Sequence, residues 1–145
     1  MTQTKRTILV VDDDERVLNV ISRYLTSKGY VVETAKTGRE AIQKSRSRFF
    51  NLAILDIRLP DMEGTELLTK MDENEPKMKK IMLTGYPNLE NAMESVNKRA
   101  DAYVVKPAEP KKLLTLVEEK LAEQEQELKL DCKKLVTYIQ TRDKE

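Results

Sequence analysis

The chain alternates five short apolar runs with segments of helical periodicity, and this alternation constrains the fold more than any other feature of the sequence. Strands that alternate with helices form a parallel sheet with right-handed crossovers and helices on both faces. The predicted strands are Thr7 to Val11, Tyr30 to Thr34, Leu52 to Leu55, Lys80 to Thr84 and Ala102 to Val105. We therefore expect a doubly wound α/β fold.

The helices are predicted from apolar residues that recur three and four positions apart. Asp14 is a suitable N-cap for the first helix, and Gly29 is a suitable stop after it. The last helix starts at Pro110 and contains no Gly or Pro as far as Glu145. The predicted helices are Glu15 to Lys28, Gly38 to Ser47, a helix after Gly64, Leu89 to Lys98, and the segment from Pro110 onward.

Polar side chains stand at the ends of four predicted strands, and they are Asp12, Asp13, Asp56, Thr84 and Lys106. The carboxyl ends of parallel strands meet at one edge of the sheet, so we expect these side chains to lie together. Three carboxylates repel one another and ionise poorly unless a cation lies among them. Because carboxylate oxygens suit Mg²⁺, the sequence predicts a magnesium site at this edge.

The same groups predict phosphoryl chemistry. Asp56 can attack phosphorus as a nucleophile, while the metal, the Lys106 ammonium and the Thr84 hydroxyl hold the phosphoryl oxygens. Each signal alone is common, because Lys-Pro pairs usually form solvated turns and threonine favours strands. The prediction rests on their combination at the ends of successive strands.

Composition excludes several classes of protein. The 26 Lys and Arg residues nearly balance the 25 Asp and Glu residues, so no overall field favours nucleic acid or an anionic membrane. Histidine is absent and there is one cysteine, which argues against zinc sites and disulfides. No apolar run is long enough to span a bilayer. We expect a cytoplasmic protein without direct nucleic-acid or membrane binding.

Four segments resemble the receiver domain of two-component response regulators. They are I-L-V-V-D-D-D-E (Ile8 to Glu15), L-A-I-L-D-I-R-L-P-D-M-E-G (Leu52 to Gly64), I-M-L-T-G (Ile81 to Gly85) and A-Y-V-V-K-P (Ala102 to Pro107). The resemblance covers about residues 5 to 122 and implies a flavodoxin-like sheet of order 2-1-3-4-5. It implies a signalling phosphoacceptor for a histidine kinase, not an enzyme beyond self-catalysed phosphoryl uptake and slow autodephosphorylation.

The resemblance also implies a role for each site residue. Asp56 corresponds to the phosphoacceptor, and Tyr103 corresponds to the aromatic residue that changes rotamer when Thr84 moves toward the phosphoryl group. Arg58 and Tyr86 occupy variable positions beside the acceptor and are expected to shield it from water. The implied metal ligands are Asp12, Asp13, Asp56 and the backbone carbonyl of Arg58, and the implied phosphoryl contacts are Thr84 and Lys106.

Other functions fit the sequence less well. Phosphatases that resemble haloacid dehalogenases need a second Asp two residues after the nucleophile, where this chain has Arg58. A flavodoxin-like nucleotide binder needs a phosphate-cradling loop after the first strand, where this chain has three acids. A flavodoxin-like binding module, or a dimerising coiled-coil adaptor without phosphotransfer, remains the alternative.

The end of the chain predicts a helical extension of the receiver. We divide the chain into a receiver domain, residues 1–122, and an extension, residues 123–145. A stripe with coiled-coil spacing, interrupted by Glu125, contains Leu121, Leu128, Cys132, Leu135 and Ile139. It predicts a homodimer through this helix. The sequence does not specify the direction of the helices in the coiled coil or how many helices it contains. The sequence also leaves open the kinase, the stimulus, the output and whether the chain belongs to a longer regulator.

Overall fold

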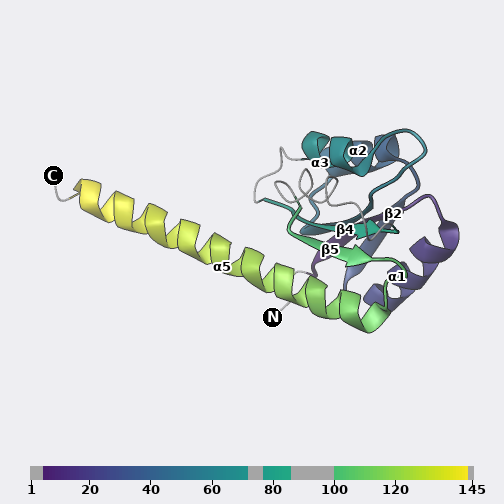
Figure 1. Cartoon of the computed structure of the whole chain (residues 1–145). Helices are drawn as coiled ribbons and strands as arrows, with labels where there is room; N and C mark the ends of the chain where they lie inside the picture. The colour runs from purple at the N-terminus through teal and green to yellow at the C-terminus, as the bar shows by residue number, and fades with distance from the viewer. Residues whose placement is uncertain (1–4, 72–76, 86–99, 144–145) are drawn as a thin grey trace.

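The computed structural model describes residues 5–71, 77–85 and 100–143, and it shows five parallel strands with helices on both sides (Figure 1). The strands are β1 (Thr7–Val11), β2 (Val31–Ala35), β3 (Leu52–Asp56), β4 (Lys79–Thr84) and β5 (Ala102–Val105). The helices are α1 (Glu15–Ser27), α2 (Gly38–Ser47), α3 (Gly64–Lys70) and α5 (Pro110–Asp143). The sheet order is β2-β1-β3-β4-β5, which confirms the expected fold class and strand order.

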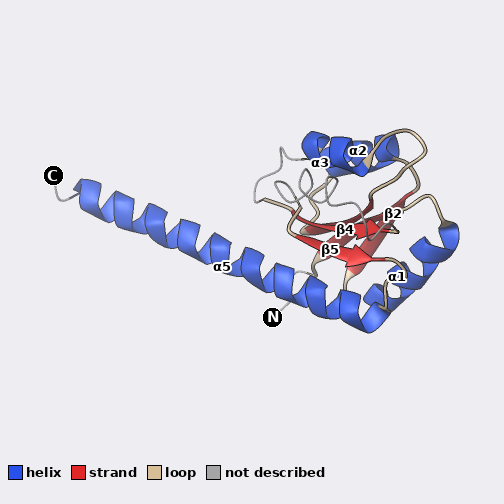
Figure 2. Ribbon diagram, viewed as in Figure 1, coloured by secondary structure: helices blue, strands red, loops and turns tan. Residues whose placement is uncertain are grey.

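The central strands β1, β3 and β4 are buried on both faces of the sheet, which explains their apolar runs, whereas the edge strands β2 and β5 are partly exposed. Helices α1 and α5 cover one face, and α2 and α3 cover the other (Figure 2). Ile8 and Val10 of β1 join the cluster under α1 and α5, whereas Leu9 and Val11 join the cluster under α2 and α3. Successive strand residues point to opposite faces, so each apolar run supplies both layers of the core.

Most predicted boundaries are confirmed within one residue. The Asp14 carboxylate accepts a hydrogen bond from the Arg16 N–H and caps α1, and Gly29 has a φ of 98° just after that helix. Strand β2 begins after Tyr30 because the N–H of Tyr30 still bonds to the Leu25 carbonyl of α1. The predicted helix Leu89 to Lys98 lies outside the described residues.

Helix α5 is much longer than the sheet it covers. Its 34 residues correspond to a length of about 51 Å. Leu113, Val117 and Leu121 are buried against the sheet, whereas the helix beyond Glu127 projects away from the body of the protein (Figure 1). We call residues 128–143 the arm. No described helix is both long enough and apolar enough to cross a membrane.

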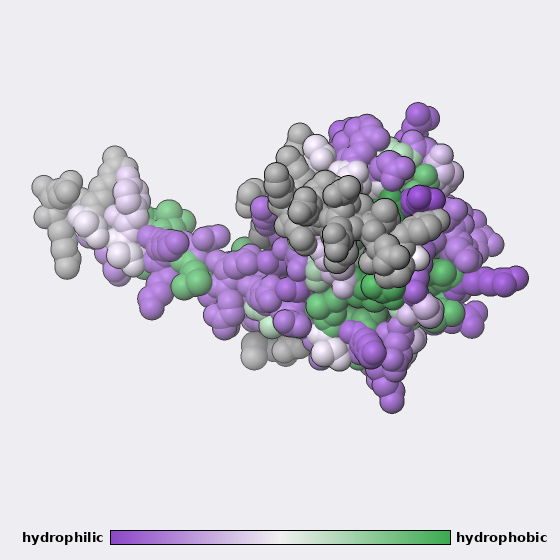
Figure 3. All heavy atoms as spheres, in the orientation of Figure 1, coloured by the Kyte–Doolittle hydropathy of each residue, from purple (hydrophilic) through white to green (hydrophobic). Residues whose placement is uncertain are grey.

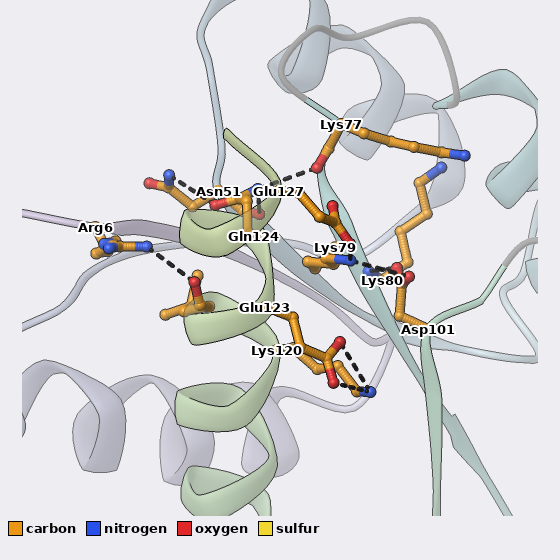
Figure 4. A network of polar contacts seen from close by, with 11 residues as sticks. Arg6, Asn51, Lys77, Lys79, Lys80, Asp101, Lys120, Glu123, Gln124 and Glu127 are labelled. Atoms are coloured by element: carbon orange, nitrogen blue, oxygen red, sulfur yellow. Dashed lines mark hydrogen bonds and ion pairs between the residues drawn. The ribbon is translucent and has the colours of Figure 1, made fainter. Parts of the chain in front are cut away.

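A polar network fastens α5 to the edge of the sheet where β3 and β4 begin (Figure 4). Gln124 is only 1% exposed, and its amide nitrogen donates to the backbone carbonyls of Asn51 at 2.8 Å and Lys77 at 3.0 Å. Its amide oxygen accepts from the Asn51 side chain at 3.2 Å. One turn later, Glu127 pairs with Lys79 at 2.8 Å. We call these five residues the latch.

The latch corrects part of the predicted coiled-coil stripe. Leu121 is 4% exposed and packs in the core beneath α1 and α5, so it is not available to another chain. Glu125 forms an ion pair with Arg6 at 3.2 Å. The apolar stripe that another chain could reach therefore begins at Leu128. The periodicity of the sequence could not show where the accessible stripe begins, because apolar residues have the same helical spacing in the core-facing part of α5 and in the arm.

The latch should contribute measurably to folding stability. We predict that Gln124→Leu lowers the free energy of unfolding by about 1–3 kcal/mol, because it removes three hydrogen bonds at a buried position. Gln126→Leu, the same change on the exposed side of the helix, is the matched control and should have little effect. Urea denaturation measures both variants. Equal losses of stability would show that the buried amide has no special role.

Candidate functional site

The predicted site residues converge at the carboxyl edge of the sheet. Asp12 directly follows β1 and is fully buried, and Asp56, the last residue of β3, is 6% exposed. Lys106 directly follows β5, and its N–H donates to the carbonyl of Thr84 at 2.7 Å. Backbone hydrogen bonds thus hold the strand ends in register. The sheet itself therefore fixes where these side chains lie.

Three carboxylates meet at this edge. One oxygen each from Asp12, Asp13 and Asp56 lies within 4.8 Å of the other two. Asp13 is exposed, whereas the other two carboxylates are buried. The backbone N–H of Asp14 donates to Asp12 at 2.9 Å, and the N–H of Arg58 donates to Asp56 at 3.3 Å. The cluster presents the oxygen ligands that Mg²⁺ prefers.

A single ammonium group joins the two buried carboxylates. The Nζ atom of Lys106 lies 3.0 Å from an oxygen of Asp12 and 3.2 Å from an oxygen of Asp56. Burial lowers the pKa of Lys106, but the hydrogen bond to Asp12 and the charge of Asp56 outweigh burial and leave the pKa raised. Lys106 therefore stays charged and partly neutralises the cluster.

The negative charge that Lys106 does not neutralise affects the pKa of Asp56. Burial raises the pKa of Asp56 above its usual value, and the nearby charge of Asp12 raises it further. Lys106 and the N–H of Arg58 act in the opposite direction without cancelling these effects. A further cation beside the three carboxylates would favour the ionised form of Asp56, which is the form that can act as a nucleophile.

The loop after Asp56 folds closely against Gly64. The N–H of Gly64 donates to the carbonyl of Ile57 at 2.7 Å, and a Cβ atom on Gly64 would lie 2.9 Å from the Asp56 carbonyl oxygen. It would also lie 2.7 Å from the Cα of Ile57. A side chain at position 64 would therefore collide with the backbone of the loop that follows Asp56.

Asp61 anchors the other end of this loop, a role that the sequence analysis missed. Its carboxylate accepts hydrogen bonds from the N–H groups of Gly38 at 2.8 Å and Arg39 at 2.9 Å, at the start of α2. The hydrogen bond from Arg39 is the main reason that the pKa of Asp61 lies below its usual value. Nothing in the sequence separates Asp61 from an ordinary turn residue after Pro60.

Thr84 and Tyr103 lie on the neighbouring strands β4 and β5. Thr84 is buried at the end of β4, beside the strand that carries Asp56. Tyr103 pairs with Met82 in the sheet and packs against the cluster under α2 and α3. Burial raises the pKa of Tyr103 to about 12, so its hydroxyl stays neutral. Tyr86, the second expected shielding residue, lies outside the described part of the chain.

An apolar cavity adjoins the charged site. It has a volume of about 540 Å³ and lies between α1 and the connection from β5 to α5. Val17 and Val20 line it from α1, while Lys106, Pro107 and Ala108 line it from the connection. Lys106 therefore borders both the acid cluster and an apolar surface that another molecule can reach.

Comparisons with known proteins point to one family. Residues 8–118 match the profile of the response regulator receiver domain. Transcriptional regulatory protein ZraR of Escherichia coli O157:H7 is 33% identical over 122 residues, which are 84% of this chain and 28% of that protein. Transcriptional regulatory protein SrrA of Staphylococcus aureus is 32% identical over 110 residues, which are 76% of this chain and 45% of that protein. The chain spans less than half the length of either relative.

Solved structures indicate the same family. A CheY-like response regulator receiver domain from Methanospirillum hungatei JF-1 superimposes with a TM-score of 0.80 at 52% sequence identity. The match covers 86% of this chain and 99% of that structure. Sheet order, acid cluster and sequence thus lead to one assignment: the chain belongs to the response regulator receiver domain family.

Proposed function

We propose that this receiver takes a phosphoryl group from a histidine kinase onto Asp56 in the presence of Mg²⁺. The observation that carries the proposal is the Lys106 ammonium, which lies within 3.2 Å of the buried Asp56 carboxylate. A carboxylate oxygen of Asp56 attacks phosphorus, the bond from phosphorus to the donor nitrogen breaks, and the imidazole leaves. Asp56 becomes an acyl phosphate.

We propose that Asp12, Asp13 and Asp56, with the backbone carbonyl of Arg58, hold the metal ion. The support is the approach of three carboxylate oxygens to within 4.8 Å, together with the raised pKa of Asp56. When bound, Mg²⁺ supplies positive charge that neutralises the cluster and the phosphoryl oxygens. Asp12 is fully buried and bonded to Lys106, and these contacts fix its orientation in the proposed metal site.

The remaining side chains have separate roles in the proposal. The Lys106 ammonium and the Thr84 hydroxyl contact the phosphoryl oxygens, and Arg58 shields the acyl phosphate from water. Thr84 moves toward the new charge, and the ring of Tyr103 takes the space that it leaves. The positions of Thr84 and Tyr103 on adjacent strands beside β3 support this coupling.

The phosphodonor must cover the site, so its contact surface must include residues beside Lys106. The apolar cavity between α1 and Pro107 is such a surface, and we propose that the kinase docks there. Exposed Val20, which lines the cavity, supports this assignment. A kinase that uses ATP would act in the cytoplasm, which is the compartment we propose for this chain.

We also propose that residues 123–145 extend the receiver, residues 1–122, into a homodimer. The support is a set of apolar side chains on the arm that are 38–60% exposed, namely Leu128, Leu130, Leu135, Val136, Tyr138 and Ile139. ZraR and SrrA are named transcriptional regulatory proteins. Because this chain has 26 basic and 25 acidic residues, we propose a change of dimer or partner surface as its output, not direct contact with DNA.

The acceptor assignment predicts which carboxylate is modified. With Mg²⁺ and a small acyl phosphate donor, the protein should gain the mass of one phosphoryl group. Asp56→Asn should remove this gain, because an amide is not a nucleophile toward phosphorus. Asp61→Asn lies in the same loop and should keep it. Intact-protein mass spectrometry measures all three proteins, and phosphorylation of Asp56→Asn at the normal rate would disprove the assignment.

The charge imbalance predicts an opposite pair of stability effects. The pKa of Asp56 is higher in the folded protein than its usual value of 3.8. The folded protein therefore loses stability relative to the unfolded chain as the pH rises above 3.8 and Asp56 ionises. Asp56→Asn should therefore raise the urea midpoint at neutral pH, and its advantage should vanish as the pH falls toward 3.8. The pKa of Asp61 is lowered, so its ionised form stabilises the fold. Asp61→Asn should lower the midpoint at neutral pH.

The effect of Mg²⁺ on folding stability tests whether Asp56 is a metal ligand. Added Mg²⁺ should raise the urea midpoint of the unmodified protein, because a ligand that binds only the folded state stabilises it. The increase should be smaller for Asp56→Asn, which lacks one of the proposed ligands. Equal responses of the two proteins to Mg²⁺ would show that Asp56 does not take part in metal binding.

A further inference from the structure

We propose that the arm pairs in an antiparallel direction with the arm of a second copy of this chain. The proposal rests on the homodimer proposed above and adds its direction, which the heptad spacing alone leaves open.

The stripe on the arm continues the side of α5 that faces the body. Gln124 marks this side, because its amide reaches the sheet at Asn51 and Lys77. Successive residues of an α-helix are rotated by about 100°, so Leu135 stands only about 20° from the direction of Gln124. By the same count Leu128 stands about 40° away and Ile139 about 60° away. The second copy must therefore approach the arm from the body side.

The body restricts the direction of that approach. In a parallel pair the second helix would run beside α5 on its body side along the whole length. It would there coincide with the sheet, which already packs against Leu113, Val117 and Leu121. In an antiparallel pair the second arm covers only residues beyond the latch, and the two bodies lie at opposite ends. Only the antiparallel pair avoids this overlap.

The charges along the stripe favour the same direction. A parallel pair that continued back to residue 125 would bring Glu125, which is paired with Arg6, close to Glu125 of the second copy. An antiparallel pair instead sets Leu128 against Ile139 of the second copy, and Cys132 against Leu135. These layers are apolar throughout. Leu128, Leu135 and Ile139 are between 38% and 59% exposed, so each has surface to bury.

The corner between the body and the arm has room for the end of a second helix. A cavity of about 710 Å³ lies there and is lined by Lys77, Glu127, Leu128 and Asp131, among others. In the proposed pair, the last turn of the second arm enters this corner. Figure 3 shows that the arm is hydrophilic where it leaves the body and carries a hydrophobic patch toward its end.

The first experiment tests the dimer. Sedimentation of the full chain should give the mass of a dimer at high micromolar concentration. Leu135→Glu should reduce it to a monomer, whereas Lys133→Glu, on the opposite side of the helix about 180° away from the direction of Gln124, should remain dimeric. Both variants should still accept phosphate, which shows that the receiver is folded. A monomeric unmodified chain would overturn both the homodimer and its direction.

The second experiment tests the direction by disulfide formation. Under mild oxidation the unmodified chain should not cross-link through Cys132. In a Cys132→Ser background, chains with Leu128→Cys should cross-link to chains with Ile139→Cys when the two are mixed and allowed to exchange, and neither should cross-link to itself. Self-cross-linking of Cys132 in a dimer, with no cross-link in the mixture, would overturn the antiparallel direction and leave the homodimer intact.

Discussion

The ammonium of Lys106, held between two buried carboxylates, is the interaction on which the functional edge of this receiver depends. It joins the end of β5 to the ends of β1 and β3, which lie 94 and 50 positions away along the chain. Buried carboxylates are costly without a counter-charge. One ammonium group nevertheless does not neutralise the negative charge of three carboxylates, and the pKa of Asp56 is therefore raised. The same deficit makes the edge receptive to a divalent cation.

The core and the site could be predicted because they follow from simple periodicities. Strand runs that are apolar at every position indicate burial on both faces, and a charged residue directly after such a run must lie at the carboxyl edge. Asp12, Asp56 and Lys106 were found in this way, and the structure brings them together. The phosphoacceptor role of Asp56 stays a prediction, because geometry shows proximity and not reaction.

Other features could not be predicted, because their cause lies between segments that are distant in sequence. Gly64 is a glycine because the backbone of Ile57 passes within reach of its missing side chain, and the sequence does not show that approach. Gln124 is one polar residue among many in a charged helix, yet it is almost fully buried. Leu121 has the spacing of a coiled coil but packs in the core.

Strand β5 connects the two ends of the sheet. It leads to Lys106 at the acid cluster, and it begins just after Asp101, whose carboxylate accepts a hydrogen bond from the N–H of Lys80 at 2.8 Å. Asp101 also lies 3.7 Å from Lys79, which is paired with Glu127 of the latch. Charged side chains therefore connect β5 at one end to the acid cluster and at the other end to the base of the arm.

The latch also gives the arm a mechanical property. Helix α5 continues without a break into the arm, and the last buried contact before the arm is at Gln124, so a tilt of α5 about Gln124 would move the whole arm. The 16 residues of the arm correspond to about 24 Å, so a tilt of about 5° at the pivot moves the far end by about 2 Å. That distance is enough to disturb the packing of one layer of side chains. A small rotation within the receiver is thus converted into a larger displacement far from the acid cluster.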